Sequence, residues 1–133
     1  MMDGSLLGPA ALLAGRLMLA WIFVHEGMLK LGAYDRAVRY AEAFGVPGAT
    51  LPAAIAVEIG CGLLIALGLF TRSAAVVLAL FCAATAMIFH AKLSETNQLL
   101  HFEKNLAMAG GFLVLAVHGA GPWSIARLWG RET

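Results

Sequence analysis

Long apolar runs alternate with short polar stretches along the chain, and four of these runs are long enough to cross a membrane. They cover residues 8–31, 51–70, 73–91 and 101–119. A helix needs about 20 predominantly apolar residues to span the hydrocarbon core of a bilayer. The pattern therefore predicts an all-α integral membrane protein: an antiparallel four-helix bundle that forms a single domain over residues 1–133.

The segments between the apolar runs predict how the helices are joined. Only the connection over residues 31–50 is long. In its "DRAVRYAEAF" stretch, one helical face carries the apolar residues Ala37, Val38, Ala41 and Phe44. This pattern favours a short amphipathic helix that lies at the membrane interface. Only Thr71 and Arg72 separate the second and third runs, so we expect a tight hairpin at these two residues.

A cleaved signal peptide is the competing interpretation of the first apolar run. Such a peptide needs a basic region before a short apolar core. Residues 1–8 contain no lysine or arginine, so we expect this run to be a membrane span.

Composition also favours a membrane protein over a soluble one. The chain is 61% hydrophobic and 13% charged, against roughly 45–50% and 25% in soluble domains. A chain of 133 residues cannot hide that much apolar surface inside a water-soluble core. The net charge of +1 and the lack of like-charge blocks argue against a nucleic-acid partner, so the lipid bilayer is the expected partner.

Ionisable and polar residues gather in one half of the predicted bundle. Alternate spans run in opposite directions, so each residue has a depth that follows from a rise of about 1.5 Å per residue. Charged groups inside a membrane face the bundle interior and pair with one another. We therefore expect a shared polar pocket in the half of the bundle opposite the termini. The candidate residues are His25, Glu26, Lys30, Glu58, His90, His101, Lys104 and Asn105.

Helical phase predicts which of these side chains meet. At about 100° per residue, Glu26 and Lys30 share one face of the first helix as an i,i+4 pair. We expect Glu58 to meet Lys104, with Glu26, Lys30 and His90 in the same pocket. Two roles stay open for these charges: a ligand- or proton-handling site, or a structural ion pair that fixes helix packing.

The remaining arginines and cysteines are expected to have structural roles. Arg16 and Arg72 lie near the side of the termini and are predicted interface anchors, because long cationic side chains reach lipid headgroups. No metal site is expected, because the histidines lack a recognised ligand spacing. Cys61 and Cys82 form no C-x-x-C or zinc pattern, and their matching depths leave a direct contact between them open.

Three segments resemble the DoxX family of small four-helix membrane proteins. They are "GRLMLAWIFVHEGMLK", "LPAAIAVEIGCGLLIALGLFTRSAA" and "EKNLAMAGGFLVLAVHGAGPWSI". Together, in this order and spacing, they cover nearly the whole chain. Family members often carry an acid shortly after the last segment's serine. Here Ala126 follows Ser124 and Ile125, so a pairing by that acid is not expected.

The resemblance implies a multi-pass protein of a bacterial or archaeal plasma membrane, with cytoplasmic termini. Some relatives are described as subunits of thiosulfate:quinone oxidoreductase and others as partners in oxidant-defence complexes. The implied function is a membrane subunit of a quinone-linked or oxidant-defence redox complex, with protein partners or a homo-oligomer. A non-catalytic scaffold for partner proteins and a small transporter with an acid-based proton relay are the alternatives.

No cofactor can be identified from the sequence, which has no Fe–S, haem-attachment, flavin or nucleotide motif. A quinone is the candidate ligand, since Lys104, His90 and Glu58 can supply the hydrogen-bond donors and proton route that its carbonyl oxygens need. The isolated chain is therefore not expected to be an enzyme, and is at most a subunit of a membrane oxidoreductase.

Overall fold

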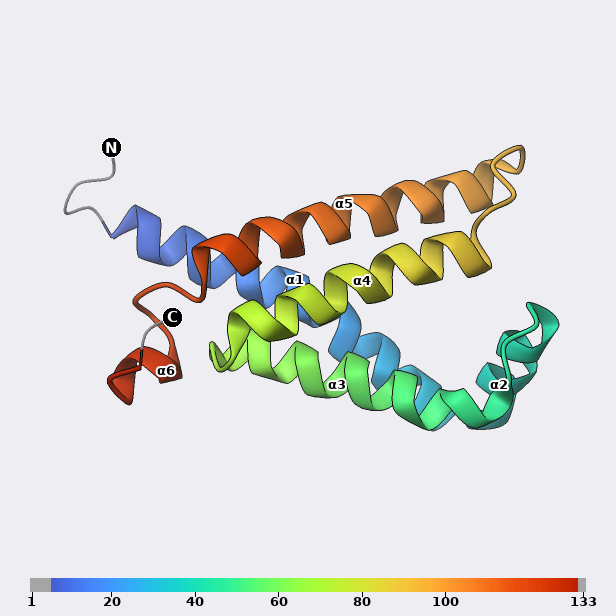
Figure 1. Cartoon of the computed structure of the whole chain (residues 1–133), viewed down its shortest axis with the longest axis horizontal. Coiled ribbons are helices and arrows are strands. Elements are labelled where there is room, and N and C mark those ends of the chain that lie inside the picture. The colour runs from blue at the N-terminus through green and yellow to red at the C-terminus, as the bar shows by residue number, and fades with distance from the viewer. Residues whose placement is uncertain (1–5, 132–133) are drawn as a thin grey trace.

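Four long helices run back and forth along one axis in the computed structural model of the chain, which describes residues 6–131 (Figure 1). They are α1 (Leu7–Gly32), α3 (Leu51–Leu67), α4 (Thr71–Phe89) and α5 (Thr96–His118). The shorter elements are α2 (Tyr34–Ala43), a 3-10 turn (Gly48–Thr50) and α6 (Ile125–Leu128). Four helical segments are long and apolar enough to cross a membrane. The predicted four-helix membrane architecture is confirmed, with α2 as the short helix of the first connection.

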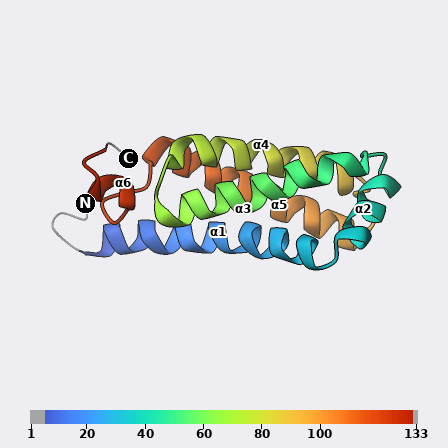
Figure 2. The ribbon, with the colours of Figure 1, turned by 90° about the horizontal axis from the view of Figure 1, so that it is seen from below.

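The long helices form two pairs. α1 packs along α3 and α4 packs along α5, while α3 contacts α4 and α1 touches α5 only slightly. Figures 1 and 2 show that α1 begins and α5 ends at one end of the bundle, whereas α2 lies at the other, which we call the α2 end. Toward the α2 end the two pairs diverge (Figure 1).

Two glycines let α1 and α3 approach each other closely. A Cβ atom on Gly62 would lie 2.8 Å from Cγ2 of Val24, and one on Gly27 would lie 2.5 Å from Cγ1 of Ile59. Both separations are too short for a real side chain, so each position depends on glycine. Small residues at such crossings bring helix backbones together in membranes, which explains why α3 is the main neighbour of α1.

Gly62→Leu is expected to push α1 away from α3 and to lower the free energy of unfolding by about 1–3 kcal/mol, the usual cost of overpacking. Gly60→Leu is the matched control on the same helix, because nothing lies within 4 Å of a Cβ atom on Gly60. Unfolding of both variants in mixed detergent micelles measures the difference. Equal losses in the two variants would contradict a close α1–α3 crossing at Gly62.

The hairpin between α3 and α4 lies earlier than predicted. Thr71 and Arg72 are the first two residues of α4, and the turn is made by the three residues before them. Gly68 ends α3 because it adopts the left-handed conformation, with φ of 73°. The N–H of Leu69 then donates to the carbonyl of Leu64 at 2.8 Å, which closes the helix. Hydropathy extended the predicted span through the turn because the turn itself is apolar.

The start of α5 also differs from the prediction. The helix begins at Thr96 rather than near residue 101. Its first turns carry several polar residues, "TNQLLHFEKN", which lowered the hydropathy on which the prediction rested. These turns are nevertheless helical, and they bring further polar side chains to the α2 end.

Candidate functional site

A cavity of about 1030 Å³ lies at the α2 end, and its wall is made by residues from α1, α2, α3, α4 and α5. Much of the wall is apolar, with Phe23, Val57, Phe81, Ile88 and Met108 among its residues. Ligand pockets commonly measure about 300–1,000 Å³ and combine apolar walls with a few polar groups. The size and lining of this cavity suit an amphipathic molecule that has an apolar ring or chain and a few polar groups.

Most of the polar residues singled out from the sequence line this cavity. They are Glu26, Lys30, Glu58, His90, His101, Lys104 and Asn105. His25 does not: its side chain is exposed on another face of α1, where the ring stacks on Trp21 with centroids 5.6 Å apart. The predicted depth of His25 along α1 is in the half of the bundle that holds the cavity. Its expected place in the pocket is wrong, because depth does not determine which face of the helix a residue occupies.

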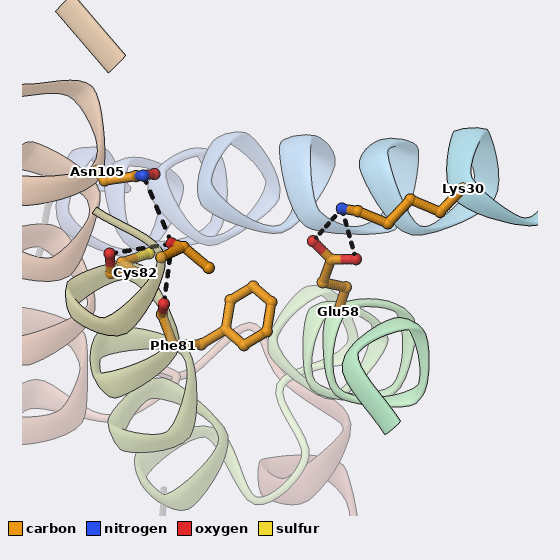
Figure 3. A network of polar contacts seen from close by, with 6 residues as sticks. Lys30, Glu58, Phe81, Cys82 and Asn105 are labelled. Carbon is orange, nitrogen blue, oxygen red and sulfur yellow. Dashed lines mark hydrogen bonds and ion pairs between the residues drawn. The ribbon is translucent and has the colours of Figure 1, made fainter. Parts of the chain in front are cut away.

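Glu58 pairs with Lys30 across the contact between α1 and α3. Lys30 Nζ donates to the two carboxylate oxygens of Glu58 at 2.7 and 2.9 Å (Figure 3). This pairing differs from both predicted ones, Glu58 with Lys104 and Glu26 with Lys30. Lys104 lies on α5, in another part of the cavity wall, because α1 rather than α5 is the main neighbour of α3.

Two histidines stack where α4 and α5 meet the cavity. The ring centroids of His90 and His101 are 5.0 Å apart, with an angle of 25° between the ring planes. His90 Nδ1 lies 2.9 Å from Oε1 of Gln98, an acceptor, so the Nδ1–H donates. His90 directly follows the last residue of α4, so it lies at the end of that helix. Imidazole nitrogens can donate and accept hydrogen bonds, which makes this pair a candidate partner for a polar group of a bound molecule.

Asn105 joins α5 to α4 on the cavity wall. It is buried, and its Nδ2 donates to the hydroxyl of Thr85 at 3.5 Å. The Thr85 hydroxyl in turn lies 2.9 Å from the carbonyl oxygen of Phe81 and 3.1 Å from that of Cys82. In Figure 3 the Phe81 side chain lies between this group and the Lys30–Glu58 pair.

An aromatic cluster on the α2 side of the cavity was missed by the sequence analysis. Tyr40 stacks on Phe89 at 5.5 Å, and Phe44 meets the same ring edge-on at 5.2 Å. The i,i+4 spacing of Tyr40 and Phe44 indicates that they share one helical face. The sequence does not show that Phe89 contacts them, because this contact depends on where α4 ends in space. Burial raises the pKa of the Tyr40 phenol above its ordinary value, so Tyr40 remains a hydrogen-bond donor at neutral pH. Gln98 was missed because the predicted span began after it.

The two predicted interface anchors have different environments. Arg16 is 1% exposed, so it does not reach the headgroups as predicted. It donates instead to the carbonyl of Trp123 at 2.5 Å and to that of Ile65 at 3.5 Å. Arg16 can be buried because two backbone carbonyls accept its hydrogen bonds. The Ile65 carbonyl is shared, since it also accepts from the N–H of Gly68 at 3.1 Å. Arg72 is exposed and donates to carbonyls at the end of α5, including that of Ala116 at 2.9 Å.

The two cysteines are free thiols. Cys82 is 1% exposed and lies in the apolar core, against which Cys61 packs. Within residues 6–131, no three His, Cys, Asp or Glu side chains are grouped closely enough to hold a metal ion.

Comparison with known proteins defines the class to which this bundle belongs. The DoxX family model matches residues 11–91 of the chain. The chain belongs to the DoxX family of membrane proteins. It is 40% identical over 126 residues to inner membrane protein YqjF of Escherichia coli, an alignment that covers 95% of this chain and 97% of the relative.

Two further relatives support the same class. Inner membrane protein YphA of Escherichia coli is 36% identical over 126 residues, which are 90% of each chain. The uncharacterized membrane protein Rv3486 of Mycobacterium tuberculosis is 31% identical over 133 aligned residues, covering 90% of this chain and 82% of the relative. No solved structure matches the chain. Together with the four apolar helices, these relatives identify a membrane protein of the inner-membrane type.

Proposed function

We propose that this protein is a membrane subunit of a quinone-linked redox system and that its cavity holds a quinone headgroup. The observation that carries the proposal is a cavity of about 1030 Å³ whose lining combines apolar walls with several polar side chains. A quinone needs both features, because its ring and isoprenoid tail are apolar while its carbonyl oxygens accept hydrogen bonds. Ligand sites of this kind place a few polar groups in a largely apolar wall.

The donors on the cavity wall suit the two carbonyl oxygens of such a ring. Lys104 and Tyr40 both line the cavity, from α5 and α2, and each has at least one N–H or O–H to donate. The stacked pair His90–His101 offers a group that can deliver or accept a proton when a quinone changes its protonation state. Lys30 is already bonded to Glu58, which leaves Lys104 as the better candidate donor.

The electrons of this proposed system come from a partner subunit, because the sequence carries no flavin, haem or Fe–S motif. The role of this chain is to bind the headgroup, exclude lipid from it and connect it to titratable groups.

We further propose that the termini are cytoplasmic, so that the cavity opens toward the outer face of the membrane.

Decylubiquinone is expected to bind the purified protein in nanodiscs, and Lys104→Ala is expected to raise its Kd about tenfold or more, as for loss of a hydrogen bond from a charged donor. Lys92→Ala is the control, because Lys92 is an exposed lysine of the α4–α5 connection outside the cavity lining. Equilibrium binding of the quinone to the three proteins measures the effect. Equal affinities in all three, or no binding, would overturn the assignment.

A membrane scaffold is the second candidate function, and the Lys30–Glu58 pair is the observation that favours it. This ion pair joins α1 to α3 without any ligand and is enough to explain two of the charges in the cavity wall. Native mass spectrometry of the protein released from its own membrane separates the two functions. A copurifying quinone supports the redox subunit, whereas partner proteins without quinone support the scaffold.

A further inference from the structure

His25 lies on the outward face of α1, where a membrane helix normally presents apolar side chains. It is exposed, stacks on Trp21, and makes no hydrogen bond to any of residues 6–131. At about 1.5 Å per residue, His25 lies about 8 Å beyond the midpoint of α1, within the span. An imidazole there leaves a donor and an acceptor unsatisfied in hydrocarbon, which is costly. Ionisable residues in spans almost always face protein or water, so this face suits a covering protein better than lipid.

Trp21 supports the same conclusion independently. Its side chain is 70% exposed, and it lies only about 2 Å from the midpoint of α1. Tryptophan is normally found at headgroup level, where the indole N–H meets water. An outward tryptophan in the middle of a span is instead typical of a protein contact, since tryptophan is enriched at the centres of interfaces.

Eight of the exposed residues of α1 continue this face along the whole helix in alternating steps of three and four residues. They form what we call the α1 seam: Leu7, Ala11, Ala14, Met18, Trp21, His25, Met28 and Gly32. A repeat of 3.5 residues keeps one seam facing a partner helix. Ala11 and Ala14 in the first half of the seam and Gly32 at its end are small residues, which allow close approach of a second backbone. None of the seam residues lines the cavity, so the seam is independent of the proposed quinone site.

The chemistry of His25 selects the partner. A neutral imidazole has one N–H donor and one nitrogen acceptor, so two copies of the same histidine can satisfy each other. In a parallel two-fold pair of α1 helices, His25 meets His25 at the same depth. In a centred antiparallel pair it would meet Ala14, which offers no hydrogen bond. We infer that this protein forms a parallel homodimer through the α1 seam, with the two His25 side chains hydrogen-bonded.

Cysteine cross-linking in native membranes tests the seam. With copper phenanthroline as the oxidant, Met18→Cys is expected to form a disulfide-linked dimer, because the two copies of residue 18 face each other. Leu80→Cys is the matched control: both side chains are strongly exposed, 74% for Met18 and 66% for Leu80, and both lie near the middle of their helices. Cross-linking of Met18→Cys no faster than that of Leu80→Cys, or to a different protein, would overturn the inference.

A second measurement tests the histidine pair itself. His25→Ala is expected to weaken dimerisation about 3- to 20-fold, the range found for polar contacts between membrane helices. Single-molecule photobleaching of the full chain in lipid, over a range of dilutions, gives the dimer fraction. His118→Ala is the control, since His118 is exposed at the end of α5, away from the seam. A dimer fraction unchanged by His25→Ala, or a monomer at all dilutions, would overturn the proposal.

Discussion

Lys30→Met is expected to lower the free energy of unfolding by about 3 kcal/mol, because it leaves the Glu58 carboxylate buried without its partner. Glu58 is 3% exposed, and both of its oxygens bond the Lys30 ammonium. Breaking a buried pair typically costs about 3–5 kcal/mol. The lower end applies here because 30% of the Lys30 side chain is exposed. Unfolding in mixed micelles, followed by circular dichroism, gives the difference from the unmodified protein.

The double variant Lys30→Met/Glu58→Leu is expected to recover most of this loss. Apolar side chains of similar size leave no stranded charge, and such replacements are often neutral. Lys92→Met is the control and should change stability by no more than about 0.5 kcal/mol, as for other exposed positions. Strictly additive losses from the two single variants would contradict a coupled pair. A double variant that folds but no longer binds decylubiquinone would assign the pair to the ligand site as well.

The half of the bundle that holds the polar groups could be predicted because depth depends only on the order of the spans and the rise per residue. Glu26, Glu58 and Lys104 come from three different helices, yet all three line one cavity. The physical basis is the cost of a charge in hydrocarbon, which acts on each span separately. No knowledge of neighbouring helices is needed for this step.

The pairing within that half could not be predicted, because it depends on which helices pack together. A small residue such as Gly27 indicates that another helix packs closely there, but it does not show which helix this is. Since α3 is that helix, Glu58 meets Lys30 of α1 while Lys104 remains on α5. The same limit explains Arg16: its depth pointed to the headgroups, but the chain after α5 folds back and covers it.

Arg16→Met is expected to loosen residues 119–131 from the bundle and to lower the free energy of unfolding by about 2–3 kcal/mol. The guanidinium joins three parts of the chain, since it belongs to α1 and donates to carbonyls of Ile65 near the end of α3 and of Trp123 before α6. Hydrogen bonds to a charged group contribute about 1.5–3 kcal/mol each. The expected loss of stability is smaller than that for two strong hydrogen bonds. The bond to Ile65 is long, at 3.5 Å, and Nε of Arg16 has no partner among residues 6–131.

Trypsin measures the release directly, because Arg127 is an exposed cleavage site in the segment that Arg16 holds. Cleavage there is expected to be several-fold faster in Arg16→Met in nanodiscs, and unchanged in the control Arg39→Met, which removes an exposed arginine of α2. Arg16→Lys should be cleaved almost as fast as Arg16→Met, because one ammonium does not reproduce the planar set of donors of a guanidinium. Gly68→Ala should resemble Arg16→Met, since a Cβ atom on Gly68 would collide with Nη1 of Arg16 and its φ of 73° disfavours a side chain. Unchanged cleavage in both Arg16→Met and Gly68→Ala would show that the segment is held by other contacts.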